Sequence, residues 1–127
     1  MASIGVGFVG CGYVADFYAK TMAAHPQLKL LGVTDRDADR AARFGGHHGV
    51  RTHGSLGQLL EDDRVSIVVN LTNPASHFEV SRAALEAGRH VYSEKPLAME
   101  MGQARELADE ARRRGLLLAS APCSVLG

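Results

Sequence analysis

The chain has 127 residues, the usual size of one domain. Hydrophobic residues make up 46% and charged residues 22% of it, which is typical of a globular domain and excludes a disordered chain. The 14 basic and 14 acidic residues cancel to a formal net charge of +0 without forming blocks, so the sequence gives no indication of binding to nucleic acid or to an anionic membrane. We expect a small molecule or another protein as the partner.

The chain contains two cysteines, Cys11 and Cys123, and neither belongs to a metal-type CxxC pair. This predicts no disulfide framework, no structural zinc site and a reducing compartment. The adjacent His47 and His48 have no companion ligand at metal spacing, so we interpret them as residues of a glycine-rich loop. The N-terminus shows no basic region followed by an uninterrupted apolar segment, and we expect a cytoplasmic protein without a membrane span.

Apolar runs alternate with helical periodicity in the first half of the chain. Residues 4–9 predict a strand buried on both faces, and apolar residues at helical spacing over 14–22 predict a helix. Residues 28–34 predict a second strand. A helix capped by Asp37 should follow and end at the glycine pair at 45–46.

The same alternation continues to the end of the chain. The remaining predicted elements are a short strand at 50–52, a short helix opened by a capping box at Ser55 and Gln58, a strand at 66–71, a helix from Asn73 and Pro74 to Gly88, a strand at 90–92, a helix from 101 to Gly115, and a strand at 116–119. Six strands separated by helices predict an α/β fold, a doubly wound parallel Rossmann sheet in the order 3-2-1-4-5-6. We expect one three-layer domain over residues 1–127, with 120–127 beginning a connection to a second domain.

A glycine-rich turn joins the first strand to the first helix. A dinucleotide-binding turn needs one glycine for the bend, a second for close approach of the pyrophosphate, and a small third residue where helix meets strand. Gly10, Gly12 and Ala15 match this pattern. The pyrophosphate would lie at the helix N-terminus, where free N–H groups and the helix dipole favour an anion.

Asp35 ends the second predicted strand about 20 residues after the turn, where an acid can bind a ribose diol. A carboxylate there favours NAD, because it repels the 2′-phosphate of NADP. Arg36 follows directly and could bind that phosphate, so NADP remains possible. An S-adenosylmethionine-binding domain is a minor alternative, since methyltransferase loops usually carry an acid before their glycines and this chain has Val9 there.

Four stretches of the chain carry a further pattern. They are VGCGYVA, VTDRD, VVNLTNPASH and SEKPLAM, with an alanine-rich helix and AGRHV between the last two. In this order they resemble the glucose-fructose oxidoreductase, inositol dehydrogenase and rhizopine catabolism (Gfo/Idh/MocA) family over essentially the whole chain. The resemblance implies a Rossmann domain followed by a larger α/β domain, and NAD(P)-dependent oxidation or reduction of sugars, cyclitols or related polyols by hydride transfer.

The resemblance also implies roles for individual residues. It assigns Gly10, Cys11, Gly12, Tyr13, Val14 and Ala15 to the pyrophosphate loop, Asp35 and Arg36 to the adenosine end, Thr72, Asn73, Pro74 and His77 to a segment along the cofactor, and Glu94 and Lys95 to the EKP motif. Glu94 would contact the nicotinamide ribose. Lys95 would be the catalytic residue, because an ammonium group can donate a proton to the substrate oxygen. The family pattern also suggests a cis bond before Pro96.

The chain departs from the family in one respect. Family members add acidic and histidine residues from the second domain, commonly as DxxxH, and no such pattern follows Lys95. We therefore expect the isolated chain to bind cofactor but to be catalytically incomplete, and to form a homo-oligomer through apolar area near its C-terminus. A non-catalytic module that senses a dinucleotide or contacts a protein is the alternative.

Overall fold

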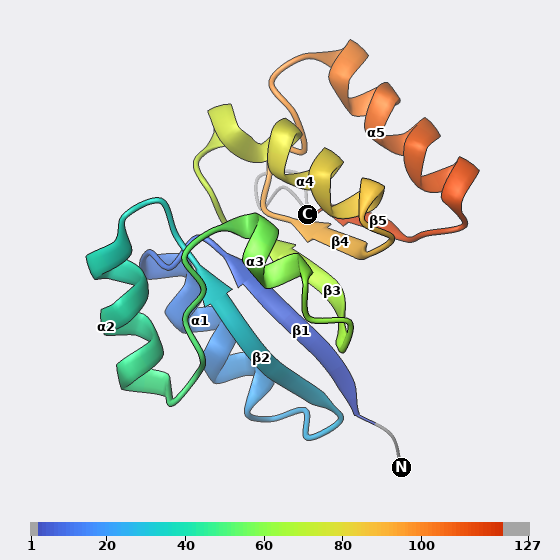
Figure 1. The fold of residues 1–127 in the computed structure, drawn as a ribbon. Helices are drawn as coiled ribbons and strands as arrows, with labels where there is room; N and C mark the ends of the chain where they lie inside the picture. The colour runs from blue at the N-terminus through green and yellow to red at the C-terminus, as the bar shows by residue number, and fades with distance from the viewer. Residues whose placement is uncertain (1–2, 121–127) are drawn as a thin grey trace.

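Five parallel strands form the sheet of the computed structural model, which describes residues 3–120 (Figure 1). They are β1 (Ile4–Val9), β2 (Leu28–Thr34), β3 (Val65–Asn70), β4 (His90–Ser93) and β5 (Leu118–Ser120). Their order in the sheet is β2-β1-β3-β4-β5. The predicted doubly wound α/β fold is thus confirmed. The connection predicted at 120–127 lies, apart from Ser120, outside the described residues.

The strand expected at 50–52 is reduced to a single bridge between Val33 and Thr52 at the outer side of β2. Backbone hydrogen bonds from Val33 to Arg51 and from His53 to Val33 hold this short contact. The chain then leaves the sheet, because Gly54 and Ser55 already begin the cap of the next helix. With the bridge counted as an edge strand, the sheet has the expected order 3-2-1-4-5-6.

Within residues 3–120, five α-helices and one 3₁₀ turn connect the strands. They are α1 (Tyr13–Met22), α2 (Ala38–His48), α3 (Leu56–Leu60), η1 (Pro74–Ser76), α4 (His77–Glu86) and α5 (Met101–Arg114). Buried side chains divide these helices between two cores. One core packs residues of α1 and α2 around Phe8 and Val33, and the other packs α3, α4 and α5 around Val68 and Val91. The helices accordingly cover both faces of the sheet (Figure 1).

The prediction that α2 stops at Gly45 and Gly46 is wrong. Both glycines lie inside α2, which ends at Gly49 with φ of 66° and a hydrogen bond from its N–H to the Gly45 carbonyl. Gly45 has a different use, because a Cβ there would clash with the Thr52 hydroxyl and lie 2.7 Å from the Val50 carbonyl oxygen. The missing side chain therefore lets the returning chain pack closely on α2.

The loop position predicted for His47 and His48 is also wrong, because both residues form the last turn of α2. The glycine pair does not break the helix, so the helix extends through them. His48 Nε2 lies 2.8 Å from Asp16 Oδ1 of α1. Among residues 3–120, no group of three histidine, cysteine or acidic side chains is placed to hold a metal ion.

The strands end in register at one edge of the sheet. Val9 is the partner of Thr34 on one side and of Asn70 on the other, and Asn70 is in turn the partner of Ser93. The strand that follows β1 in the chain lies on one side of it, and the strands from β3 onward lie on the other side. At such a switch in strand order a crevice forms, here at the carboxyl ends of β1 and β3. The segments that follow these strands contain the residues singled out by the sequence.

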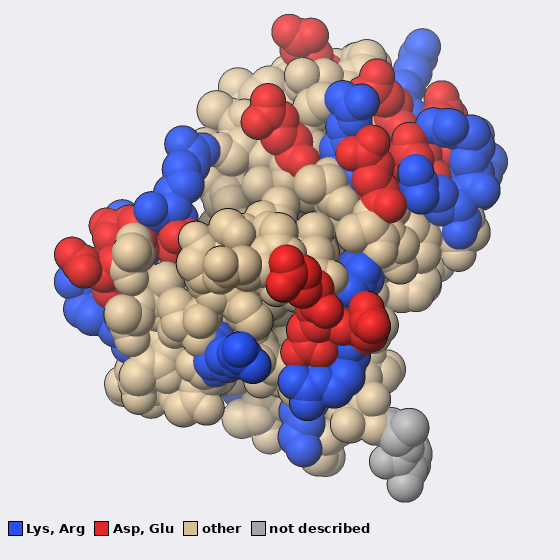
Figure 2. All heavy atoms as spheres, in the orientation of Figure 1, with Lys and Arg blue, Asp and Glu red and all other residues tan. Residues whose placement is uncertain are grey.

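Acidic and basic side chains are interspersed on the face shown in Figure 2. The densest group lies over α5, where Arg113 and Glu110 form an ion pair at 2.7 Å. Exposed pairs of this kind contribute little to stability. In the part of the chain that the structure describes, no helix has the length and apolar character needed to cross a membrane.

Candidate functional site

The glycine turn after β1 is wedged between the ends of its two neighbouring strands. Gly10 has φ of 102°, in the region that favours glycine, and its N–H donates to the Thr34 carbonyl at 2.8 Å. A Cβ on Gly10 would lie only 2.6 Å from the carbonyl carbon and oxygen of Leu71. The turn therefore depends on glycine at position 10 for both its backbone conformation and its packing.

Gly12 has a different environment, because a Cβ there would meet no protein atom within 4 Å. It is the N-cap of α1, and no side chain caps this helix end. The Ala15 N–H donates to the Gly12 carbonyl at 3.0 Å, and the remaining N–H groups of the first turn and the open space beside Gly12 suit an anion such as a pyrophosphate. Ala15 is fully buried against the sheet, so its small size serves the packing of α1.

Asp35 connects the end of β2 to the glycine turn. One carboxylate oxygen accepts a hydrogen bond from the Cys11 N–H at 2.7 Å, and the other accepts one from the Asp37 N–H at 2.8 Å. Arg40 lies 3.8 Å away, and the Asp35 side chain is only 9% exposed. Because a carboxylate can accept about four hydrogen bonds, both oxygens retain capacity for a ribose diol.

A cleft of about 890 Å³ opens beside this turn. The predicted site residues in its lining are Gly10, Gly12, Asp35, Arg36, Thr72 and Asn73. Segments after β1, β2 and β3 thus form one concave surface. The Arg36 guanidinium donates a hydrogen bond to the Ser76 hydroxyl, which joins the β2 side of the cleft to η1. Asn73 caps η1 by accepting from the Ser76 N–H at 3.1 Å.

Asn70, a residue that the sequence did not single out, organises the segment after β3. It is completely buried, and its amide donates to the His77 carbonyl and to the Ser81 hydroxyl, both at 2.9 Å. Its side-chain oxygen accepts from the Thr72 hydroxyl at 2.6 Å and from the Thr72 N–H at 3.3 Å. Every side-chain hydrogen-bonding group of Asn70 therefore holds the cleft wall in place.

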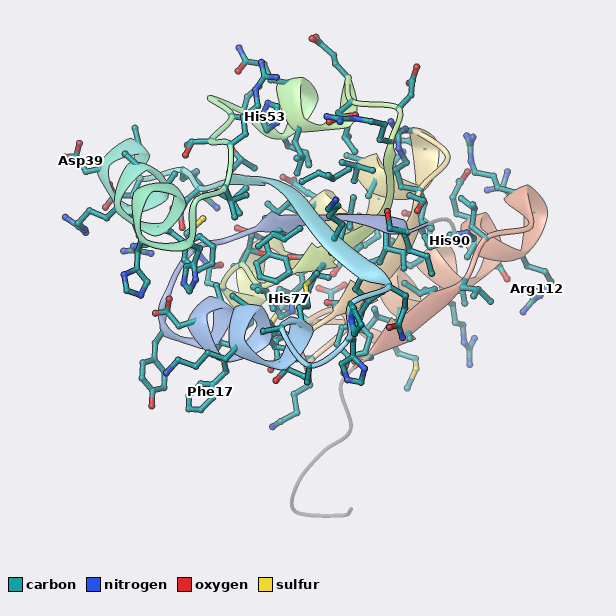
Figure 3. All side chains as sticks on the ribbon, turned by 90° about the horizontal axis from the view of Figure 1, so that it is seen from below. Phe17, Asp39, His53, His77, His90 and Arg112 are labelled. Atoms are coloured by element: carbon teal, nitrogen blue, oxygen red, sulfur yellow. The ribbon has the colours of Figure 1, made fainter. Side chains whose placement is uncertain are left out.

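His77 lies inside the protein and not in the lining of the cleft (Figure 3). The residue is 1% exposed, with Nε2 at 2.7 Å from the Thr72 carbonyl and Nδ1 in hydrogen-bond contact with the Pro96 carbonyl. The ring therefore joins the segment after β3 to the EKP turn. That His77 lies along a bound cofactor stays a prediction.

The EKP turn follows β4 at the same edge of the sheet. The Lys95–Pro96 peptide bond is cis, as the resemblance implied. The Glu94 N–H donates to the Asn70 carbonyl at 3.0 Å, and its carboxylate accepts a hydrogen bond from the Tyr18 hydroxyl of α1. Lys95 is exposed. The turn lies one strand beyond the cleft, whose lining does not include it.

Tyr18 is a second residue that sequence reasoning used only as part of an apolar helix face. Its ring packs edge-on against Phe8 and Tyr92. Burial raises the pKa of the Tyr18 hydroxyl, and its hydrogen bond to Glu94 raises this pKa further. The hydroxyl therefore keeps its proton and remains a donor to the carboxylate at neutral pH.

Tyr13, Val14 and Pro74 are exposed members of the predicted site that do not line this cleft. Tyr13 is 76% and Val14 40% exposed on the first turns of α1. Tyr13 packs edge-on against Phe17, which lies on the outer side of this helix (Figure 3). Pro74 occupies the first position of η1, where its missing N–H leaves no helix hydrogen bond unmade.

Cys11 lies in the glycine turn, and its thiol is buried and stays protonated. The residue is 5% exposed, and its thiol donates to the Thr34 carbonyl at 3.5 Å. Burial and the nearby charge of Asp35 raise its pKa from 9.0 to about 12. The position thus needs a small side chain and supplies no thiolate.

We expect Cys11 in the native chain to resist alkylation by iodoacetamide at pH 8. A rise in pKa from 9.0 to about 12 leaves roughly a thousandfold less thiolate, and burial adds a further barrier. Mass spectrometry of the peptide containing Cys11 should show labelling in urea and almost none in buffer. Equal labelling rates in the two conditions would contradict this account.

Comparison with known proteins places this geometry in a family. The family model described as "Oxidoreductase family, NAD-binding Rossmann fold" matches residues 4–121. A UDP-N-acetylglucosamine 3-dehydrogenase of Acidithiobacillus ferrooxidans is 38% identical over 120 residues, which are 94% of this chain and 37% of that protein. The chain thus spans about a third of the length of such curated relatives.

Two solved structures have the same fold. GenD2 from gentamicin A biosynthesis, crystallised in complex with NAD, is 36% identical with a TM-score of 0.92, and the match covers 95% of this chain and 35% of GenD2. KijD10, a 3-ketoreductase of Actinomadura kijaniata crystallised with NADP and TDP-benzene, is also 36% identical with a TM-score of 0.87, and the match covers 93% and 37% of the two chains. These matches favour a dinucleotide over S-adenosylmethionine as the cofactor. The chain therefore belongs to the Gfo/Idh/MocA oxidoreductase family and contains its NAD-binding Rossmann domain.

Proposed function

We propose that the chain is the dinucleotide-binding unit of an oxidoreductase that acts on sugars, cyclitols or related polyols. When bound, the dinucleotide would supply the hydride acceptor or donor. The cleft beside the glycine turn carries this proposal, because the open N-terminus of α1, the Asp35 carboxylate and the Thr72 segment all line it. The sugar dehydrogenase and ketoreductase activities named for relatives support the substrate class.

In this proposal each part of the site has a separate task. The first N–H groups of α1, opened by Gly12, bind the pyrophosphate. Asp35 accepts hydrogen bonds from the adenosine ribose, and Glu94 accepts them from the nicotinamide ribose. Lys95, at an exposed position next to Glu94, donates a proton to the substrate oxygen or accepts one from it.

The chain should prefer NAD(H) to NADP(H). The Asp35 side chain is nearly buried at 9% exposure, and the guanidinium of Arg40 lies 3.8 Å away as a weak counter-charge. A 2′-phosphate would place a second negative charge next to this carboxylate, which is unfavourable in a site of low solvent access. Arg36 already donates to Ser76 and would have to exchange that partner to bind a phosphate.

Calorimetry of NADH and NADPH binding tests this proposal. We expect wild type to bind NADH more tightly than NADPH, and Asp35→Ala to lower the ratio of NADH to NADPH affinity roughly tenfold. The variant loses the hydrogen bonds to the ribose, which favour NADH, and it also loses the repulsion of the 2′-phosphate, which disfavours NADPH. A general loss of structure would lower both affinities and leave the ratio unchanged.

Asp39→Ala is the matched control for this measurement. Asp39 lies two residues into α2, outside the cleft, and its side chain points away from the body of the protein (Figure 3). Asp39→Ala removes the same charge from the same segment as Asp35→Ala, so the ratio of NADH to NADPH affinity should stay within about twofold of wild type. Absence of binding of either dinucleotide by wild type at millimolar concentration would overturn the proposed function.

We also propose that this chain alone turns over such substrates slowly or not at all and self-associates in solution. Lys95 is the one acid-base group that the resemblance assigns within the chain, and efficient proton transfer also needs groups that position the substrate. Large apolar side chains are exposed at Phe17, Met101 and Leu117, with 55%, 71% and 74% of their surface accessible. Such groups favour association.

A further inference from the structure

We propose that Tyr18 of α1 is a positioning residue for the EKP turn, and that its hydroxyl fixes Glu94 for the nicotinamide end of the site. This inference rests on the proposed function. The Tyr18 hydroxyl donates a hydrogen bond to Oε2 of Glu94, which lies 76 residues further along the chain. Tyr18 lies in the same helix whose N-terminus follows the glycine turn, so α1 contributes to both ends of the site.

The backbone of Glu94 is already fixed by its neighbours. Its N–H donates to the Asn70 carbonyl at 3.0 Å, and its carbonyl accepts from the Ser93 hydroxyl at 2.9 Å. Its carboxylate has Tyr18 as the hydrogen-bond donor among the described residues. The backbone contacts therefore set where the residue is, and the Tyr18 hydroxyl sets where its charge points.

The tyrosine ring is held firmly enough to do this. Its centroid lies 6.4 Å from that of Phe8 at an interplanar angle of 82°, and 6.0 Å from that of Tyr92 at 63°. Phe8 is completely buried. Edge-to-face packing on two aromatic rings restricts the orientation of Tyr18. The donor is therefore pre-organised before any ligand binds.

The charge of the pair has a single arrangement. The tyrosine hydroxyl can act as donor and acceptor, while an ionised carboxylate only accepts. Tyr18 is therefore the donor and the Glu94 carboxylate the acceptor, a charge-assisted hydrogen bond of the stronger kind. A second face of the carboxylate stays available for ribose hydroxyl groups. Without the Tyr18 hydroxyl, the Glu94 carboxylate can leave this orientation, and the EKP turn loses its side-chain link to α1, so the hydrogen bond from the Glu94 N–H to Asn70 should open more often.

Tyr18→Phe tests the inference through two ligands. NADH reaches the nicotinamide end of the site, whereas ADP occupies only the adenosine and pyrophosphate part. We expect the variant to bind NADH roughly three- to tenfold more weakly and ADP within about twofold of wild type. Ser66→Ala is the matched control. It also removes one hydroxyl, which donates to the Gly5 carbonyl at 3.3 Å near the other end of the sheet, and should leave both affinities unchanged.

A double-mutant cycle decides whether Tyr18 acts through Glu94. In a Glu94→Ala background, Tyr18→Phe should no longer change NADH affinity, because the group it positions is absent. An equal effect in both backgrounds would overturn the inference, as would equal losses of NADH and ADP affinity in the single variant. The last result would show that Tyr18 merely supports the fold.

Hydrogen exchange of the ligand-free chain gives a readout independent of binding. We expect the Glu94 amide to exchange at least about threefold faster in Tyr18→Phe than in wild type, while amides in β1 are unchanged. An unchanged Glu94 amide together with unchanged NADH affinity would refute the inference. If wild type binds neither NADH nor ADP, the proposed function fails, and the exchange rate alone then decides whether Tyr18 holds the turn.

Discussion

Gly10→Ala is expected to lower the free energy of unfolding by about 3 kcal/mol and to abolish NADH binding. Position 10 has φ of 102°, which an alanine adopts only with strain, and its Cβ would lie 2.6 Å from the Leu71 carbonyl group. The backbone strain and the close contact with Leu71 both destabilise the variant. A change in φ cannot relieve the strain without cost, because it would break the hydrogen bond from the Gly10 N–H to the Thr34 carbonyl. Urea denaturation followed by circular dichroism measures the loss.

Gly12→Ala is the matched control, and it should separate stability from binding. Gly12 has φ of −82°, which alanine accepts, and no protein atom lies within 4 Å of the added methyl group. We expect a loss of stability below about 1 kcal/mol, from a poorer N-cap. NADH affinity should nevertheless fall roughly tenfold, because the methyl group fills the space that the pyrophosphate needs.

Each glycine variant has a result that would contradict the role given to that glycine. Gly12→Ala with unchanged NADH affinity would show that the pyrophosphate does not approach this turn. Gly10→Ala with wild-type stability would contradict the close contact with Leu71. The experiment thus assigns one glycine to the fold and the other to the ligand.

Asn70→Ala is expected to lower the free energy of unfolding by about 3 kcal/mol, a large effect for removal of one polar side chain. The substitution leaves a cavity and takes a partner from His77, Ser81 and Thr72 in a region where Asn70 itself has no exposure. Buried groups that lose their partner are costly, because water cannot replace it. Chemical denaturation with a fluorescent or circular dichroism readout checks the value.

Asn73→Ala provides the comparison three residues further along the chain. Asn73 is exposed, and its side chain accepts one hydrogen bond, from the Ser76 N–H at the start of η1. Loss of such a cap lowers stability by about 1 kcal/mol. Similar losses for the two asparagine variants would contradict the central role of the Asn70 side chain in the wall of the cleft.

The sequence alone determined the architecture of this protein. The apolar runs predicted β1 and β2 with their observed bounds, and the motif order predicted the family. These features were readable because buried parallel strands and helix caps depend on neighbouring residues. The Asp37 cap and the capping box of Ser55 and Gln58 are examples, since each is satisfied within a few residues.

Local signals were insufficient where a residue has two physical uses. Gly45 has the residue type of a helix end, yet it lies within α2, and its missing side chain makes room for Thr52. The strand expected at 50–52 has β propensity but makes one bridge, because only the start of α3 decides how long the chain stays beside β2. Secondary-structure propensity cannot show which segment, distant in the sequence, will pack against a residue.

The tertiary structure decided how the site is held. Asn70 and Tyr18 belong to an apolar strand and an apolar helix face, and nothing nearby in the sequence distinguishes them from core residues. Their partners lie at the cleft wall and in the EKP turn, up to 76 residues away. His77 is likewise buried between the segment after β3 and the EKP turn, which its position in the sequence did not indicate. A motif gives the residues that could meet a ligand, whereas the hydrogen bonds that orient them exist only once distant segments are packed together.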